Sequence, residues 1–198
     1  MGLFIEDGQG AGFQAGVTND NRVKVATVGA TRVEGGAIQG QAWNFDYGTI
    51  NHTSATESGV LYVKNTDPLL YLVCSKMLVS IGKSTGSPAT DVIVRVYSNP
   101  TGGTLISNAV AAVIANKNFG LSVPPAALVY KGLEGYTVTG GTVVATRIFQ
   151  DATHQELDIA DVLAPGSSFA ITVQPHTSNT AMLSSIPLHV YQINSNNA

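Results

Sequence analysis

The chain has 198 residues and a mass of 20.6 kDa, which fits one domain, with or without an extension. Charged residues make up 12% of it, about half the share in an average soluble protein, and the formal net charge is −3. This balance argues against nucleic-acid binding, because contacts to phosphates need clustered Lys and Arg side chains. Apolar residues make up 44% of the chain, so we expect a folded core.

Cysteine usage and the N-terminal residues narrow the class of protein further. Cys74 is the single cysteine, which excludes an intrachain disulfide and a multi-cysteine zinc site, and its apolar neighbours predict a buried side chain. The first residues lack the basic and apolar regions of a secretory signal, and Glu6 stands where a myristoylation motif needs Ser or Thr. No apolar run approaches the roughly 18 residues that span a bilayer. We therefore expect synthesis in a cytoplasm without membrane insertion.

Residues 1–20 differ in composition from the rest of the chain. Five glycines separate a few apolar residues that follow no period, so this segment is not expected to close a core of its own. It still carries apolar side chains that a flexible linker would lack. We predict an extended N-terminal arm that orders against a neighbouring subunit, with a disordered start as the alternative. The candidate assembly contacts in the arm are Leu3, Phe4, Ile5 and Phe13.

Period-two alternation follows, and it predicts strands. Trp43, Phe45 and Tyr47 share one face of a strand, either as a subunit contact or as part of the core. After a turn at 99–103, Leu105 and Ile106 are expected to begin the returning strand of a hairpin. Residues 108–115 are the most plausible short helix of the chain, since Ala favours a helix, but Val and Ile favour a strand and both alternatives stay open. The other strands are expected at 22–25, 60–64, 69–82 (with a bulge), 92–97, 127–130, 141–150, 168–173 and 186–193.

Short strands separated by Gly, Pro, Asn and Ser turns, with almost no helix, define the expected fold class. They predict an all-β protein, an antiparallel β-sandwich or jelly roll with a Gly-rich N-terminal arm. We assign residues 1–20 to the arm and residues 21–198 to a single sandwich domain. Alternatively, residues 21–50 extend the arm.

No pattern in the sequence indicates catalysis, a cofactor or a metal site. Gly8 to Gly12 follow no clear strand and lack the lysine of a phosphate-binding loop. The segment HQELDIAD carries three neighbouring acids, yet a glycoside hydrolase needs two carboxyl groups held across a cleft. We interpret that segment as a solvated loop with the acids Glu156, Asp158 and Asp161. The four histidines fit no metal-binding spacing and are interpreted as surface or interface residues: His52, His154, His176 and His189.

Three stretches together resemble virion structural proteins of tailed bacteriophages. They are Asn21–Val25, the run SATESGVLYVKN from Ser54 to Asn65, and the turn NPTGGT from Asn99 to Thr104. The likeness covers about half of the chain and consists of strand and turn patterns, so it assigns no functional residue. It implies a non-enzymatic particle protein, foremost a capsid decoration (cement) protein that stabilises the capsid by binding across its subunits.

This resemblance also implies partners and a location. The expected partners are the major capsid protein or other virion proteins, together with copies of the same chain in a homotrimer. The expected location is the virion, assembled in the cytoplasm of a bacterial host, without direct contact to nucleic acid or membrane. The alternative is a receptor- or glycan-binding module of a head or tail fibre. A glycan-active enzyme would need a carboxylate pair in a groove.

Overall fold

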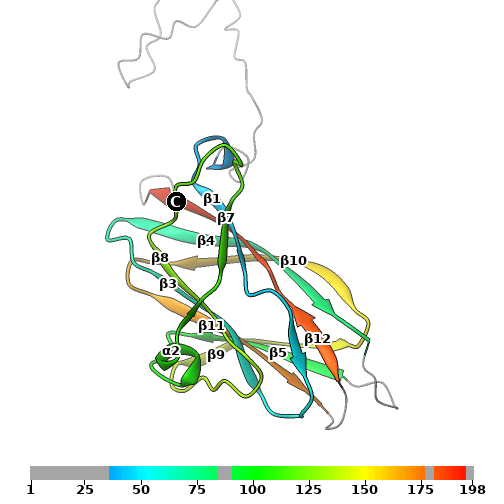
Figure 1. The fold of residues 1–198 in the computed structure, drawn as a ribbon. Coiled ribbons are helices and arrows are strands. Elements are labelled where there is room, and N and C mark those ends of the chain that lie inside the picture. The colour runs from blue at the N-terminus through cyan, green and yellow to red at the C-terminus, as the bar shows by residue number, and fades with distance from the viewer. Residues whose placement is uncertain (1–35, 84–90, 177–180, 195–198) are drawn as a thin grey trace, which may run out of the picture. The chain divides into compact units, whose positions relative to one another are not determined.

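The computed structural model describes residues 36–83, 91–176 and 181–194 (Figure 1). The chain divides into two units at residue 31, and every described residue belongs to the second unit. The arm, its four apolar candidates, the glycines at 8–12 and the strand expected at 22–25 lie outside the described residues.

The described residues form two antiparallel β-sheets, so the chain is an all-β sandwich, as predicted. The jelly-roll connectivity stays a prediction. The first sheet contains β1 (Ala42–Asp46), β2 (Ile50–His52), β4 (Leu70–Ile81), β7 (Val113–Asn116), β10 (His154–Leu163), β12 (Met182–Ser185) and β13 (Leu188–Asn194). The second sheet has the order β6-β8-β3-β11-β5-β9, with β3 (Ser58–Asn65), β5 (Asp91–Ser98), β6 (Val110–Ala111), β8 (Ala127–Lys131), β9 (Thr142–Gln150) and β11 (Ser168–Pro175).

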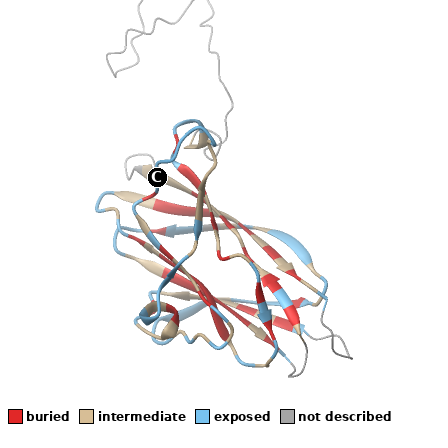
Figure 2. Cartoon of the chain, viewed as in Figure 1, coloured by how far each residue is buried: buried red, intermediate tan, exposed pale blue. Residues whose placement is uncertain are grey.

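Alternation in the sequence places the core between the sheets (Figure 2). In β5, Val92 and Val94 are fully buried, while Arg95 points to the opposite face. In β4 the pairing with β13 shifts between Lys76 and Cys74, which confirms the expected bulge and keeps both halves of the strand facing inward. Cys74 is buried as predicted, and burial raises the pKa of its thiol.

Trp43, Phe45 and Tyr47 lie in this core and are between 0% and 3% exposed. Of the two interpretations offered for this aromatic face, the core is the one that the structure supports for the folded chain. The Trp43 indole Nε1–H donates to the Val123 carbonyl at 2.8 Å, so the one polar atom of the ring has a partner.

Two expectations for local structure are wrong, and one open alternative is decided. Leu105 and Ile106 lie in a one-turn helix, α2 (Thr104–Ser107), because Leu105 packs onto the outer face of the second sheet. The ambiguous segment 108–115 contains strands β6 and β7 instead of a helix. The acidic segment is not a loop but strand β10, since Leu157 and Ile159 alternate inward and pack against the core.

The two long edges of the sandwich are built differently. On one edge, residues 110–116 run as a single segment from β6 in the second sheet to β7 in the first, and the Ala112 amide donates to Val129 O at 3.0 Å. We call this segment the closed edge. On the other edge, β9 and β10 are joined by the turn at 151–153 but belong to different sheets, and in the described part of the chain β9 pairs only with β5 and β10 only with β4 (Figure 1). We call β9 and β10 the open edge.

Candidate functional site

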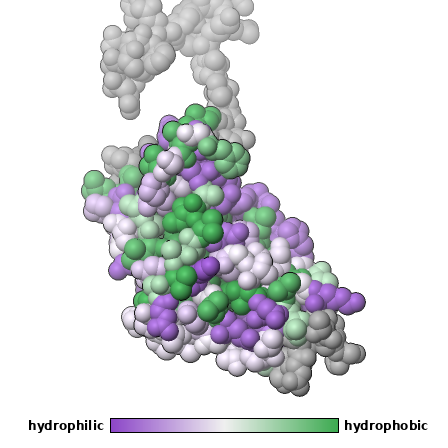
Figure 3. Space-filling view, viewed as in Figure 1, coloured by the Kyte–Doolittle hydropathy of each residue, from purple (hydrophilic) through white to green (hydrophobic). Residues whose placement is uncertain are grey.

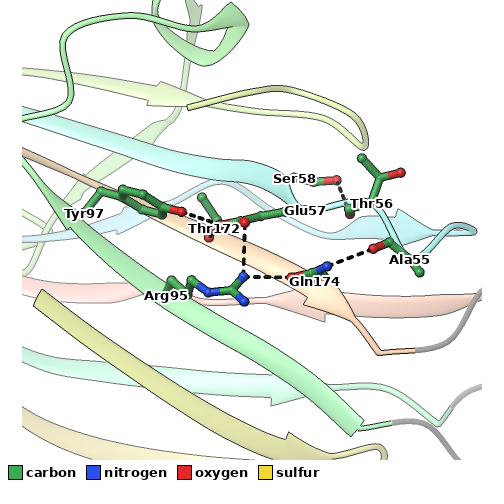
Figure 4. A network of polar contacts seen from close by, with 8 residues as sticks. All are labelled: Ala55, Thr56, Glu57, Ser58, Arg95, Tyr97, Thr172 and Gln174. Atoms are coloured by element: carbon green, nitrogen blue, oxygen red, sulfur yellow. Dashed lines mark hydrogen bonds and ion pairs between the residues drawn. The ribbon is translucent and has the colours of Figure 1, made fainter. Parts of the chain in front are cut away.

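The most connected polar cluster lies on the outer face of the second sheet, around Glu57 (Figure 4). Glu57 precedes β3, and its carboxylate Oε1 accepts hydrogen bonds from the Tyr97 hydroxyl at 2.9 Å and the Thr172 hydroxyl at 2.5 Å. Oε2 forms an ion pair with Arg95 Nη1 at 3.1 Å. Arg95 and Thr172 are cross-strand partners on β5 and β11, so the sheet register itself places them side by side.

This cluster continues from Arg95 to the bend before β3. Arg95 Nη1 donates to Gln174 Oε1 at 2.8 Å, and Gln174 Nε2 donates to the Ala55 carbonyl at 3.2 Å. Burial and the bond to Glu57 raise the pKa of Tyr97, which favours the protonated hydroxyl as donor. Both carboxylate oxygens of Glu57 have partners in this network. The network therefore holds residues 55–57 against the sheet, and the Glu57 carboxylate is not free to act as a general base.

Tyrosines beside this network serve packing. The rings of Tyr62 and Tyr130 stack with centroids 5.6 Å apart and an interplanar angle of 20°. Leu105 and Val138 pack onto the same small cluster, which α2 and the loop near residue 138 cover. No sequence pattern predicts this group of tyrosines, because it depends on three strands that are distant in sequence.

A second polar group is buried inside the fold. The Ser184 hydroxyl lies 2.8 Å from His52 Nε2 and 3.1 Å from the Tyr47 hydroxyl. His52 and Ser184 are both fully buried, which corrects the expectation of a surface or interface histidine at this position. Burial lowers the pKa of His52, and its Nδ1 has no hydrogen-bond partner among the described residues. With no access from solvent, this serine–histidine pair cannot reach a substrate.

The acidic residues of β10 lie at the open edge. Glu156 forms an ion pair with Lys76 on β4, and Asp158 lies 4.0 Å from the same ammonium group. The hydrogen bond from Lys76 lowers the pKa of Glu156. Asp161 is the cross-strand partner of the buried Cys74, so it points to the inner side of the sheet, into a cleft between β9 and β10. The remaining histidines differ in setting: His154 and His176 are exposed and His189 is half-buried.

An exposed apolar surface lies at the end of the sandwich where β1 begins. Phe119 is 93% exposed, and Leu121 and Val123 on the same loop are also exposed. Asn118 Nδ2 donates to the Ile38 carbonyl at 3.3 Å, which brings the exposed Ile38 next to this loop. Figure 3 shows apolar atoms gathered at this end. We call Ile38, Phe119, Leu121 and Val123 the apolar tip.

A groove of about 340 Å³ runs beneath the tip between the loop and β7, and Trp43 forms part of its floor. The tip was not among the contacts predicted from the sequence. Its signal was the run of Phe, Leu and Val in a segment, 117–126, that carries no strand periodicity.

Neither a family model nor a curated protein matches the chain. In the described part of the chain, no three His, Cys, Asp or Glu side chains are grouped so that they could hold a metal ion. The described helical segments are also too short to cross a membrane. The fold and the surfaces above therefore define the class as an all-β sandwich with an exposed apolar end and, within the described residues, a cleft between the edge strands β9 and β10.

Proposed function

We propose that this protein is a non-enzymatic structural subunit of a bacteriophage virion, and specifically a decoration protein that stabilises a capsid by binding across its subunits. The proposal combines the resemblance described for the sequence with the apolar tip. In this proposal the protein resides in the virion and its partner is the major capsid protein or another virion protein. The predicted homotrimer stays a prediction.

The observation that carries the proposal is the exposure of the apolar tip. A phenylalanine that is 93% exposed keeps almost all of its ring in water, and burying such a side chain releases about 1.5–3 kcal/mol. Ile38 is 72% exposed beside it, and no charged residue belongs to the tip. Clustered exposed apolar side chains of this kind mark protein contact sites.

The mode of action follows from mass action. A subunit that binds only the assembled shell adds its binding free energy to the stability of that shell. Because the tip is uncharged and apolar, binding should depend little on salt concentration, in contrast to binding through exposed ion pairs. Repetition over many sites on one particle would increase retention further.

Heating of phage particles tests this function. Particles lacking the protein are expected to assemble but to release their genome at a lower temperature than complete particles, at both low and high salt. Equal release temperatures would contradict the stabilising role. Loss of host attachment with unchanged release temperature would instead support the receptor- or glycan-binding alternative.

A point variant tests whether the tip is the contact. Phe119→Ser in the full chain should weaken binding to particles that lack the protein by about ten- to a hundredfold, as expected when one buried aromatic anchor is lost. Leu69→Ser is the matched control, because Leu69 is 74% exposed but lies in the turn before β4. Equal binding by both variants would exclude the tip as the contact.

A further inference from the structure

The open edge combines unpaired backbone with exposed apolar side chains. Among the described residues, β9 is hydrogen-bonded only to β5, and β10 only to β4, so the other side of each strand has no backbone partner. Val144 is 58% exposed, Ile148 is 68% exposed and Val162 is 55% exposed. Two adjacent unpaired strands of nine and ten residues are a template for pairing with another chain.

A cleft separates the two strands of the open edge. It consists of a cavity of about 100 Å³ and a wider one of about 330 Å³, which share Val96, Phe169 and Asp161 in their walls. The floor is apolar, whereas Arg147 lies on the β9 side and Asp161 on the β10 side. Within the described ranges, neither Arg147 nor Asp161 forms an ion pair.

We infer that a second copy of this chain covers the open edge, and that the two copies are related by a twofold axis parallel to β9 and β10. Such a rotation exchanges the two sides of the cleft and keeps the direction of every strand. Because β9 and β10 run in opposite directions on either side of the turn at 151–153, β9 of one copy then lies antiparallel to β10 of the other. Both unpaired edges are satisfied at once, in the geometry that antiparallel pairing requires.

Charge complementarity favours a second copy as the partner. Arg147 and Asp161 line the same cavity, so rotation about an axis parallel to the strands brings each Arg147 to the cavity that Asp161 of the other copy lines, on the inner face of the joined sheets. Charges that point into the cleft disfavour unspecific edge pairing and admit a partner with the opposite charge at that position.

The buried area favours two copies over the three predicted from the sequence. Strands of this length span about 30 Å, and two edges about 10 Å apart, with side chains that extend about 5 Å beyond each sheet, present a face of about 600 Å² per copy. A twofold contact uses both edges of both copies and buries about 1,200 Å², the lower end of the range for specific contacts. In a threefold arrangement each contact would pair one edge of each copy and bury about half as much, below that range.

The test is the mass of the full-length protein in solution, measured by light scattering at tens of micromolar. The wild-type protein should have twice the 20.6 kDa mass of one chain. Arg147→Glu should reduce it to a single chain, because the introduced carboxylate would face Asp161 of the other copy, and Asp161→Lys should do the same. Lys131→Glu, which makes the same charge change on β8 at the far side of the second sheet, should leave the mass unchanged. Circular dichroism verifies that each variant is folded.

An equimolar mixture of the two variants gives the decisive result. In a twofold contact between an Arg147→Glu chain and an Asp161→Lys chain, the introduced carboxylate meets the introduced ammonium group at one of the two strand pairs. At the other strand pair, the native Arg147 meets the native Asp161. The mixture should therefore recover the two-chain mass, although within each variant chain positions 147 and 161 carry charges of the same sign. A mixture that stays at one chain overturns the inference, as does a monomeric wild-type protein or an Arg147→Glu variant with wild-type mass.

The same measurement separates this inference from the proposed function and from the predicted trimer. A three-chain wild-type mass would overturn the twofold contact and support the homotrimer. A monomer that still binds particles through the apolar tip would overturn the contact and leave the proposed function intact.

Discussion

The closed and open edges of the sandwich differ in how the two sheets meet. At the closed edge, one continuous segment, residues 110–116, borders both sheets, and the loop that follows it covers Trp43. At the open edge, β9 and β10 leave a cleft between them, with exposed apolar side chains and inward charges. Among the described residues, one edge therefore joins the two sheets through a single segment, whereas the other leaves β9 and β10 as separate edge strands with a cleft between them.

The largest loss of folding stability is expected from a substitution in the core next to the closed edge. Trp43→Ala removes a buried ring and the hydrogen bond to Val123, next to a groove that is already present. The free energy of unfolding should fall by about 3–5 kcal/mol. Chemical denaturation of the full chain measures it. A loss below about 1 kcal/mol would mean that the loop over Trp43 does not seal this side of the core.

The Glu57 network is expected to have an intermediate effect. Glu57→Gln keeps the shape of the side chain but leaves Arg95 without its ion-pair partner, and Arg95 is only 23% exposed. Stability should fall by about 1–3 kcal/mol, the usual cost of a partly buried polar group that loses a charged partner. The control is Glu156→Gln at the solvent-exposed pair with Lys76, where no measurable change is expected. Equal effects at both sites would show that the network adds no stability beyond a surface ion pair.

A smaller effect is expected from pH, through the buried His52. Its pKa lies below the ordinary value of 6.5 because burial disfavours the charged ring. The unfolded chain therefore binds a proton at this ring before the folded chain does, so the contribution of His52 to stability should be fully present above pH 7 and decrease as the pH falls below about 6.5. Denaturation at pH 8 and pH 5.5 measures the difference. His52→Gln should reduce this dependence, and an unchanged dependence would assign it to other groups.

The smallest effect on folding is expected at the open edge. Ile148→Ser changes a side chain that is 68% exposed, so unfolding of the single chain should shift by less than about 0.5 kcal/mol. Compared with the loss expected for Trp43→Ala, this small shift would show that the side chains of the open edge contribute little to the folding of one chain. A loss comparable to that of Trp43→Ala would show that β9 is part of the core of one chain.

Much of the fold could be predicted from local pattern. Alternation identified β3, β4, β5, β8, β9 and β11, because one face of each strand is buried and the side-chain period in a strand is two. It also predicted the bulge in β4. The same rule failed for Leu105 and Ile106, since two adjacent apolar residues fit the start of a strand as well as a one-turn helix whose site is created by other strands.

The candidate surfaces were harder to find. The exposed side chains of β9 are apolar residues like any other in the sequence, and nothing local distinguishes them from buried ones. For Phe119 the one local signal is that residues 117–126 carry no strand periodicity. The acids of β10 were interpreted as a loop because their charge outweighed the alternation of Leu157 and Ile159. Pairing with β4, together with the ion pair between Lys76 and Glu156, makes that segment a strand.

What the sequence determined by itself was the class of fold, the buried cysteine and the position of most strands, because these depend on neighbours a few residues apart. The tertiary structure decided which aromatic residues enter the core, which acids are engaged, and which edge stays open. Each of these depends on strand order: the hydrogen bond from Thr172 to Glu57 forms, and Arg147 and Asp161 come to line one cavity, only after the strands have been placed side by side.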